Sequence, residues 1–277
     1  MAKKKYIFEN PVGSLLGDEE IEAIKKVLTA NTSLTRGKEV DLFEKKFSKF
    51  IGSKFSIAVS SCGAALELSS KILELKENDE VICQANLFWP TYNHLIKKNV
   101  NIKIADINPR TLNIDVNSLK KIISKKTKAV YIMHHGGNPC DLFNINKLKK
   151  KFKFKLVEDC AHACGSIYKN KKIGSDSDIA CFSFSTLKNI TTLGEGGMIV
   201  TNSKKYNEYA RLLRTNFPIG KRVQKKILKL GKYNRPTKLD YSFSGDAWNT
   251  KYWKEISEIG STFRMSSPQA AVGVVQL

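Results

Sequence analysis

The chain of 277 residues has little arginine, no long apolar run and no paired-cysteine pattern. Only 7 of its 47 basic residues are arginine, the usual base-reading and bidentate phosphate-binding residue. No stretch approaches the length of a membrane span, and no signal-length apolar run follows the basic N-terminus. We therefore predict no nucleic-acid partner, no membrane partner and a cytoplasmic location.

The cysteines lack the spacing of a disulfide framework or a metal site. They are Cys62, Cys83, Cys140, Cys160, Cys164 and Cys181. All except Cys140 lie in or beside apolar strand-like runs or candidate site residues, which suits reduced, partly buried thiols. Cys160 and Cys164 form a single pair without a second pair at metal-site spacing, so we predict no metal.

What the chain has in excess is lysine. The formal net charge is +21, and 40 lysines are scattered along many amphipathic stretches, with a local density at 221–232. We interpret this excess as a compositional bias rather than a binding surface, although it would attract anionic substrates. A hydrophobic content of 42% fits a globular protein with a core.

Helical and strand patterns alternate over most of the chain. Acidic residues after Gly17 open an amphipathic helix, and Val40, Phe43 and Phe47 share one face of a second helix. The alternation that follows predicts an α/β domain with a largely parallel sheet. Predicted strands are 57–59, 80–83, 103–106, 129–133, 155–158, 180–184 and 197–201; predicted helices are 17–28, 38–50, 64–75, 91–98, 117–124, 144–151 and 203–213.

Lys188 lies in an irregular segment between two predicted strands, among small residues and close to Gly194, Gly196 and Gly197. A lysine amine in such a place can reach a bound ligand. Any one of 40 lysines is more often a solvated charge, and this context is what singles out Lys188.

Asp159 follows an apolar strand, with Glu158 facing the opposite side. In parallel α/β sheets, ligands lie at the carboxyl ends of strands, where an acid can pair with a ring nitrogen of a cofactor. Taken by itself, an aspartate here is more often a turn-forming or helix-capping residue.

A third feature is the run from the strand 57–59 into Ser61, Cys62 and Gly63 at a helix start. Backbone N–H groups and serine hydroxyls there can bind phosphate, and no Gly-Lys-Ser/Thr follows that would indicate a Walker loop. A phosphate cradle, a carboxylate for a ring nitrogen and an amine for a carbonyl together suit pyridoxal phosphate, which forms a Schiff base with a lysine.

With these motifs, the sequence resembles the sugar aminotransferases of the DegT/DnrJ/EryC1/StrS type, which are fold type I pyridoxal-phosphate enzymes. The resemblance implies a large domain with a mostly parallel sheet between helices, in three α/β/α layers. It implies an aminotransferase that moves an amino group, with glutamate as donor, to a nucleotide-linked keto-sugar in polysaccharide or related sugar biosynthesis. The matching stretches are 61–66, 157–165 and 182–201, supported by 79–82, 88, 134–139 and 260–271.

The resemblance also assigns catalytic and ring-binding roles by position. Lys188 would form the Schiff base and move a proton between substrate and cofactor, and Asp159 would keep the pyridinium nitrogen protonated. Phe88 would stack on the ring, and His162 would lie near the cofactor face. From the residues alone, Phe88 can equally be an ordinary core aromatic.

The implied phosphate contacts come from Ser61, Cys62, Gly63 and Ser183. Relatives often carry Gly-Thr where this chain has Cys62-Gly63, so a threonine hydroxyl is absent and mainly backbone amides remain. Ser183 by itself could be a polar position of a half-buried strand. Arg264 matches a position that in relatives reaches the neighbouring subunit's cofactor phosphate, which implies a homodimer, but it can equally be a surface arginine.

Two parts are predicted along the chain. Residues 1–215 would form the pyridoxal-phosphate-binding large domain with an N-terminal helical segment, and 216–277 a basic, aromatic connection and the start of a truncated C-terminal domain. Residues 216–254 lack periodicity and look like an insertion. Residues 267–277 begin an apolar helix, with Pro268 in its first turn, where relatives continue into a smaller domain. We therefore expect a fragment or half of a split enzyme.

Two other functions stay open. A catalytically incomplete family member, acting as a fragment or a regulator, is suggested by the C-terminus and the altered Cys62-Gly63 pair. A sugar 3-dehydrase of the same family is the second, but members of that branch replace the Schiff-base lysine with histidine, and Lys188 argues against it.

Overall fold

The computed structural model describes residues 6–9, 13–30, 33–35, 37–215 and 260–277. The predicted insertion at 216–254 and the lysine-rich stretch at 221–232 lie outside these described residues. The division into two parts at residue 215 stays a prediction.

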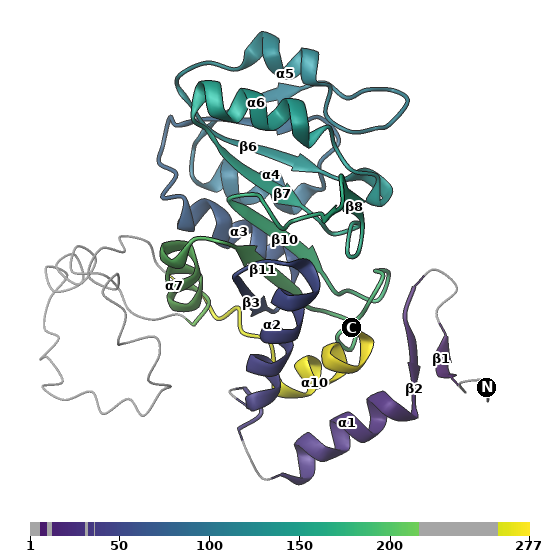
Figure 1. Ribbon diagram of the computed structural model, residues 1–277. Coiled ribbons are helices and arrows are strands. Elements are labelled where there is room, and N and C mark those ends of the chain that lie inside the picture. The colour runs from purple at the N-terminus through teal and green to yellow at the C-terminus, as the bar shows by residue number, and fades with distance from the viewer. Residues whose placement is uncertain (1–5, 10–12, 31–32, 36, 216–259) are drawn as a thin grey trace, which may run out of the picture.

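A seven-stranded sheet organises the described part of the chain, in the order β3-β11-β10-β7-β6-β4-β5 (Figure 1). β11 pairs antiparallel with both neighbours and all other pairs are parallel, so six strands run in one direction. The predicted, largely parallel sheet is confirmed. The strands are β3 (Phe55–Val59), β4 (Glu80–Gln84), β5 (Asn101–Ala105), β6 (Thr127–Met133), β7 (Lys155–Asp159), β10 (Ile179–Ser183) and β11 (Gly197–Thr201).

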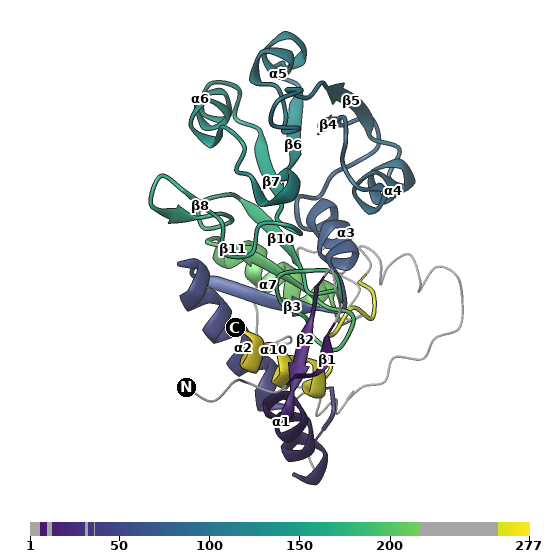
Figure 2. The ribbon, with the colours of Figure 1, turned by 90° about the vertical axis from the view of Figure 1, so that its right-hand side faces the viewer.

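Helices cover both faces of this sheet, which confirms the three layers. Side chains alternate along each strand, so Ile57 and Val59 pack on one face and Ala58 on the other. One face carries α3 (Cys62–Ile72), α4 (Trp89–Lys97) and α7 (Lys204–Leu213). The other carries α2 (Lys38–Ile51), α5 (Val116–Ile122), α6 (Leu142–Phe152) and α10 (Ser267–Gln276). Figure 2 shows α3 and α4 on one side of the strands and α6 on the other.

The two ends of the described chain pack together beside the sheet. In α2, Val40, Phe43 and Phe47 are buried as their spacing predicts. The predicted apolar helix forms as α10 and packs on α2 and on α1 (Asp18–Thr29) (Figure 1). Gly273 permits this close approach, because a Cβ there would come within 2.6 Å of the Phe43 ring.

Two short hairpins were not predicted, because their strands are too short to show a period-2 pattern. β1 (Tyr6–Glu9) pairs with β2 (Leu15–Gly17), and β8 (Ile167–Tyr168) pairs with β9 (Lys171–Lys172). In the second hairpin, Lys169 and Asn170 both have positive φ, at 46° and 64°, as a tight two-residue turn requires.

None of the six cysteines forms a disulfide, and Cys83, Cys140, Cys160 and Cys181 are buried. Within the described residues, no helix has both the length and the apolar character needed to cross a membrane.

Candidate active site

The residues singled out in the sequence meet at one edge of the sheet. β3, β7 and β10 end at this edge, and antiparallel β11 begins there. Gly197 pairs with Ser183 on one side and with Val59 on the other. Cys181, two residues before the end of β10, is level with Asp159. The strand ends therefore bring together segments that are more than a hundred residues apart in the chain.

The first wall of the site is the N-terminus of α3. The Ser61 hydroxyl oxygen caps the helix by accepting from the Ala64 amide at 3.0 Å. The hydroxyl proton remains available, and the amides of Cys62 and Gly63 have no intrahelical partner. This arrangement suits an anion at the helix start, as predicted.

Gly197 was not singled out as a site residue, although the Gly-Gly pair in the sequence was a signal. A Cβ at Gly197 would lie 2.4 Å from the Ser61 carbonyl carbon and 2.7 Å from the Cys62 amide nitrogen. Only glycine lets β11 pass this close behind the α3 N-terminus, so Gly197 fixes the position of that wall.

Asp159 ends β7 and is 3% exposed. Its Oδ1 accepts from the Ala161 amide at 3.0 Å, which is the turn-forming role, and Oδ2 accepts no hydrogen bond from the described residues. Burial raises the pKa of this carboxyl, although the Ala161 amide and the positive charge of Lys188 act in the opposite direction. One carboxylate oxygen is thus left for a cationic partner such as a protonated ring nitrogen.

The Cys62 thiol lies beside Asp159. Its Sγ lies 4.0 Å from Asp159 Oδ1 and 3.7 Å from the Cys181 carbonyl oxygen. Burial, and then the nearby Asp159 charge, hold the pKa of this thiol well above its usual value. A raised pKa favours the neutral thiol over the nucleophilic thiolate.

Lys188 is half-buried in the loop between β10 and β11, and its amide donates to the Ser185 carbonyl at 3.0 Å. Its side-chain charge acts on Asp159, Cys62 and His162, so the amine lies within electrostatic reach of all three. The structure thus brings Lys188 to the edge where Asp159 and the α3 N-terminus meet.

Both ends of the described chain hold the Lys188 loop in place. Ser14 donates to the Thr186 carbonyl through its hydroxyl at 2.6 Å and its amide at 3.0 Å. From α10, the Gln269 amide group donates to the Glu195 carbonyl at 2.8 Å. Sequence reasoning missed Ser14 and Gln269 as supports, because no local pattern indicates contacts across this chain separation.

Two further candidate residues, His162 and Phe88, lie near the same edge. His162 follows β7; its Nδ1 accepts from the Gly136 amide at 3.4 Å, and its pKa is lowered by burial and then by the Lys188 charge. Phe88 caps α4 and is 65% exposed, so the core-aromatic alternative is wrong. An exposed ring at this edge is free to stack on a ligand, and that role stays a prediction.

Ser183 and Arg264 complete the predicted set. Ser183 is the buried last residue of β10, a strand buried throughout, so the half-buried alternative is wrong. Arg264 forms a bridge with Val59, and its Nη1 donates to the Thr215 carbonyl at 3.4 Å. Its Nε is buried without a partner among the described residues, so Arg264 is not a freely solvated arginine.

Behind Asp159, on the other face of the sheet, His134 and Glu158 form a buried pair. The Cys140 amide donates to His134 Nδ1 at 3.0 Å, and Nε2 lies 3.0 Å from Glu158 Oε2, so the proton is on Nε2. Gly174 donates a second hydrogen bond to Glu158, at 3.2 Å. Cys160 is close enough to share a metal ion with both side chains, but these hydrogen bonds already account for the arrangement.

Two solved structures of enzymes share this fold. A Helicobacter pylori PseC structure, named as an aminotransferase involved in the biosynthesis of pseudoaminic acid, aligns with a TM-score of 0.77 and 29% identity over 99% of this chain and 65% of that chain. An E. coli GDP-4-keto-6-deoxy-D-mannose-3-dehydratase with bound hydrated PLP aligns with a TM-score of 0.80 and 29% identity over 98% and 68%. The fold is that of the fold type I pyridoxal-phosphate aminotransferases.

Residues 15–277 match the DegT/DnrJ/EryC1/StrS aminotransferase family, and the chain belongs to this pyridoxal-phosphate-dependent family. The spore coat polysaccharide biosynthesis protein SpsC of Bacillus subtilis is 35% identical over 95% of this chain and 62% of its own length. A GDP-perosamine synthase of Escherichia coli O157:H7 is 32% identical over 95% and 64%. The chain therefore spans less than two thirds of the length of these relatives.

Proposed function

We propose that this chain is the cofactor-binding part of a pyridoxal-phosphate-dependent aminotransferase that acts on a nucleotide-linked keto-sugar. One observation carries the proposal: Lys188, Asp159 and the α3 N-terminus, which are distant in the chain, lie together at one sheet edge. The relatives support the substrate class, because they include a GDP-perosamine synthase and a polysaccharide biosynthesis protein. We further propose that glutamate is the amino donor and that the protein is cytoplasmic. We also propose a homodimer in which Arg264 reaches the cofactor phosphate of the neighbouring subunit.

The residues present fit the cofactor. The α3 start and Ser183 would hold its phosphate, Asp159 Oδ2 its ring nitrogen, and Phe88 one face of its ring. A cationic ring nitrogen would offset the burial cost that raises the pKa of Asp159. When bound, the cofactor would serve as electron sink and carrier of the amino group.

Lys188 would move the proton at the substrate carbon that carries the nitrogen. The loop bonds from Ser14 and Gln269 would fix where its amine can reach. A sugar 3-dehydrase is the less favoured alternative: several of the matching solved structures are named as 3-dehydratases, but Lys188 stands where we expect histidine in that branch.

A covalent-trapping experiment tests this proposal. The chain is mixed with one equivalent of pyridoxal phosphate, its absorbance is recorded, and borohydride is added before peptide mass spectrometry. We expect an absorbance band near the edge of the visible range. We also expect the label to lie mainly on one peptide, the one that contains Lys188. Lys188→Ala should lose both, whereas Lys97→Ala, a change at an exposed lysine on α4, should lose neither.

Label spread over many lysines in a folded sample would contradict the proposal and favour a catalytically incomplete family member. If labelling at Lys188 is observed, adding glutamate should bleach the band, because the amino group then moves to the cofactor. If the band persists with glutamate, the proposed amino donor is wrong, while the assignment of Lys188 still holds.

A further inference from the structure

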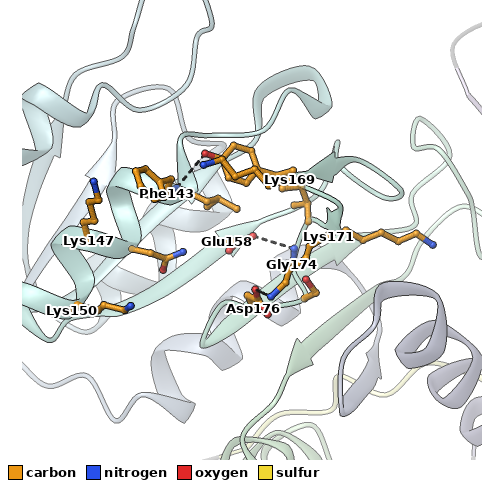
Figure 3. Close-up of a pocket in the computed structure, with 14 residues that line it drawn as sticks. Phe143, Lys147, Lys150, Glu158, Lys169, Lys171, Gly174 and Asp176 are labelled. Carbon is orange, nitrogen blue, oxygen red and sulfur yellow. Dashed lines mark hydrogen bonds and ion pairs between the residues drawn. The ribbon is translucent and has the colours of Figure 1, made fainter.

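A pocket lies on the opposite side of the sheet from Asp159, between α6 and the β8–β9 hairpin (Figure 3). Its volume is about 380 Å³, within the range of small-molecule sites. Apolar side chains of Leu142, Tyr168 and Ile173 form part of its lining, and the buried Glu158 lies at its inner end. None of the residues assigned to the cofactor lines it. We call it the α6–hairpin pocket.

The charge of the α6–hairpin pocket is strongly positive. Five lysines and two carboxylates line it. Both carboxylates have partners, because Asp176 pairs with Lys171 at 2.6 Å and Glu158 accepts from His134 and Gly174. The other four lysines, Lys147, Lys150, Lys169 and Lys172, have no carboxylate within ion-pair distance among the described residues. Asp141, which does not line the pocket, offsets part of the Lys169 charge, and the pocket keeps an excess of positive charge.

Two of these ammonium groups contact the same aromatic ring. Lys147 Nζ from α6 and Lys169 Nζ from the hairpin each lie 4.1 Å from the centre of the Phe143 ring. The two nitrogens are therefore within twice that distance of each other, although like charges repel. Figure 3 shows Lys147 and Lys150 on α6 and Lys169 on the hairpin opposite. A bound anion would relieve the repulsion between these groups.

Hydrogen bonds within the chain hold the walls of the pocket. The Tyr168 hydroxyl donates to Asp141 Oδ1 at 3.2 Å and accepts from the Phe143 amide at 3.3 Å, which fastens the hairpin to the start of α6. At the other end of the hairpin, Gly174 donates to Glu158. The walls are thus held by hydrogen bonds, and little ordering is needed on binding.

We propose that the α6–hairpin pocket binds an organic phosphate. The phosphate contacts Lys147, Lys150 and Lys169, since lysine ammonium groups bind phosphate as point charges. The apolar body of the ligand packs on Leu142, Tyr168 and Ile173. The same lysines disfavour a metal ion next to Glu158, because a cation would have to pass an array of positive charge. This site does not depend on the proposed aminotransferase function.

Calorimetric titration of the whole chain with ADP, adenosine and inorganic pyrophosphate tests the proposal, at about 0.15 M salt to screen scattered lysines. We expect ADP to bind with a stoichiometry of one, adenosine not to bind, and pyrophosphate to bind more weakly than ADP. No binding of ADP, or pyrophosphate binding as tightly as ADP, would overturn the proposed ligand class.

Paired variants locate the site. Lys147→Ala with Lys169→Ala should weaken ADP binding at least about tenfold, because two charge-assisted contacts are lost. Lys97→Ala with Lys121→Ala removes the same charge from exposed positions on α4 and α5 and should leave the affinity within about twofold. Equal weakening by both pairs would mean binding to net charge and would overturn the site.

Ser183→Ala distinguishes this pocket from the proposed cofactor site, because Ser183 lies on the α3 face of the sheet and the pocket lies on the α6 face. ADP affinity should be unchanged in this variant. A loss equal to that of the paired lysine variant would place ADP in the cofactor site and overturn the proposal. Thermal melts of all variants check that each one is folded.

Discussion

Glu158 and Asp159 are adjacent carboxylates at the end of β7, and the regions around them are built differently. Glu158 is buried on the α6 side of the sheet and accepts hydrogen bonds from His134 Nε2 and the Gly174 amide. Asp159 is buried on the α3 side and accepts one hydrogen bond from an amide, that of Ala161. Both bonds to Glu158 end on the same oxygen, Oε2, and one of them comes from a titratable side chain. Among the described residues, Asp159 has only a backbone amide and the weaker Cys62 thiol as donors.

The difference follows from strand geometry. Successive side chains of a strand point to opposite faces, so neighbours in sequence have unrelated surroundings. A buried carboxylate with a charge-assisted partner is stabilised more than one with a single amide donor, and the second gains more when a cationic partner binds.

A third buried carboxylate, Glu44, should show the largest loss of stability when it is removed. Glu44 of α2 lies 2.6 Å from Arg214 and 2.7 Å from Arg211, and accepts from the Ala58 amide at 2.9 Å. Glu44→Ala should destabilise the fold by about 3–5 kcal/mol, because it leaves two arginines beside an unpaired buried amide. Urea unfolding measures the change.

Glu22→Ala is the matched control for Glu44→Ala, since Glu22 forms an exposed pair with Lys25. We expect it to change stability by less than about 0.5 kcal/mol. A similar loss in both variants would show that burial of Glu44 does not decide its contribution.

Acid should remove the Glu44 contribution. Burial alone would raise its pKa, but the charges of Arg214 and Arg211 outweigh burial and hold the pKa below the ordinary 4.5. A lowered pKa means that the stabilisation is complete above about pH 4.5 and is lost as pH falls through the folded-state pKa. Unfolding free energies from pH 3 to 7 should fall more steeply at the acid end in wild type than in Glu44→Gln; parallel curves would count against this.

Glu158→Gln should have an intermediate effect of about 1–3 kcal/mol. The substitution keeps the shape and can keep an oxygen at the Oε2 position, but it replaces a carboxylate by a neutral amide. It therefore removes the charge that strengthens the bonds from His134 Nε2–H and the Gly174 amide. Denaturant unfolding measures the effect, and stability unchanged from wild type would contradict the structural role of Glu158.

Asp159→Asn should change the stability least, by less than about 1 kcal/mol, yet should weaken pyridoxal phosphate binding by at least about tenfold. Because burial raises the pKa of Asp159, deprotonation costs native stability as pH rises from about 4 through the folded-state pKa. This slope is opposite in sign to that of Glu44 and should be absent in the variant.

Absorbance titration with the cofactor and urea unfolding at several pH values separate the two effects of Asp159→Asn. A large stability loss with unchanged cofactor affinity would reverse the comparison between Glu158 and Asp159.

Regular elements were predictable where periodicity was long. The Val40, Phe43 and Phe47 spacing predicted α2, and Pro268 at the start of an apolar run predicted α10. The hairpins β1–β2 and β8–β9 were missed, because strands of two to four residues carry no measurable period. Contacts such as Ser14 with Thr186 were also unpredictable, since sequence separation gives no information on them.

The candidate site was predictable in its parts and not in its assembly. Lys188, Asp159 and the Ser61 helix start each carried a local signal, while Gly197 was recognised only once its missing Cβ was seen to face Ser61. The alternatives for Phe88 and Ser183 depended on burial, which one sequence does not specify.

The sequence by itself determined the alternation of strands and helices, the chemical groups available and the family to which they belong, because these depend on residue type and local order. Only the tertiary structure decided that Glu158 accepts from His134 and Gly174 while Asp159 lies beside Cys62 at the start of α3, and that Lys147 and Lys169 line a separate pocket. Hydrogen-bond partners, burial and electrostatic fields come from segments far apart in the chain, and folding alone brings them into contact.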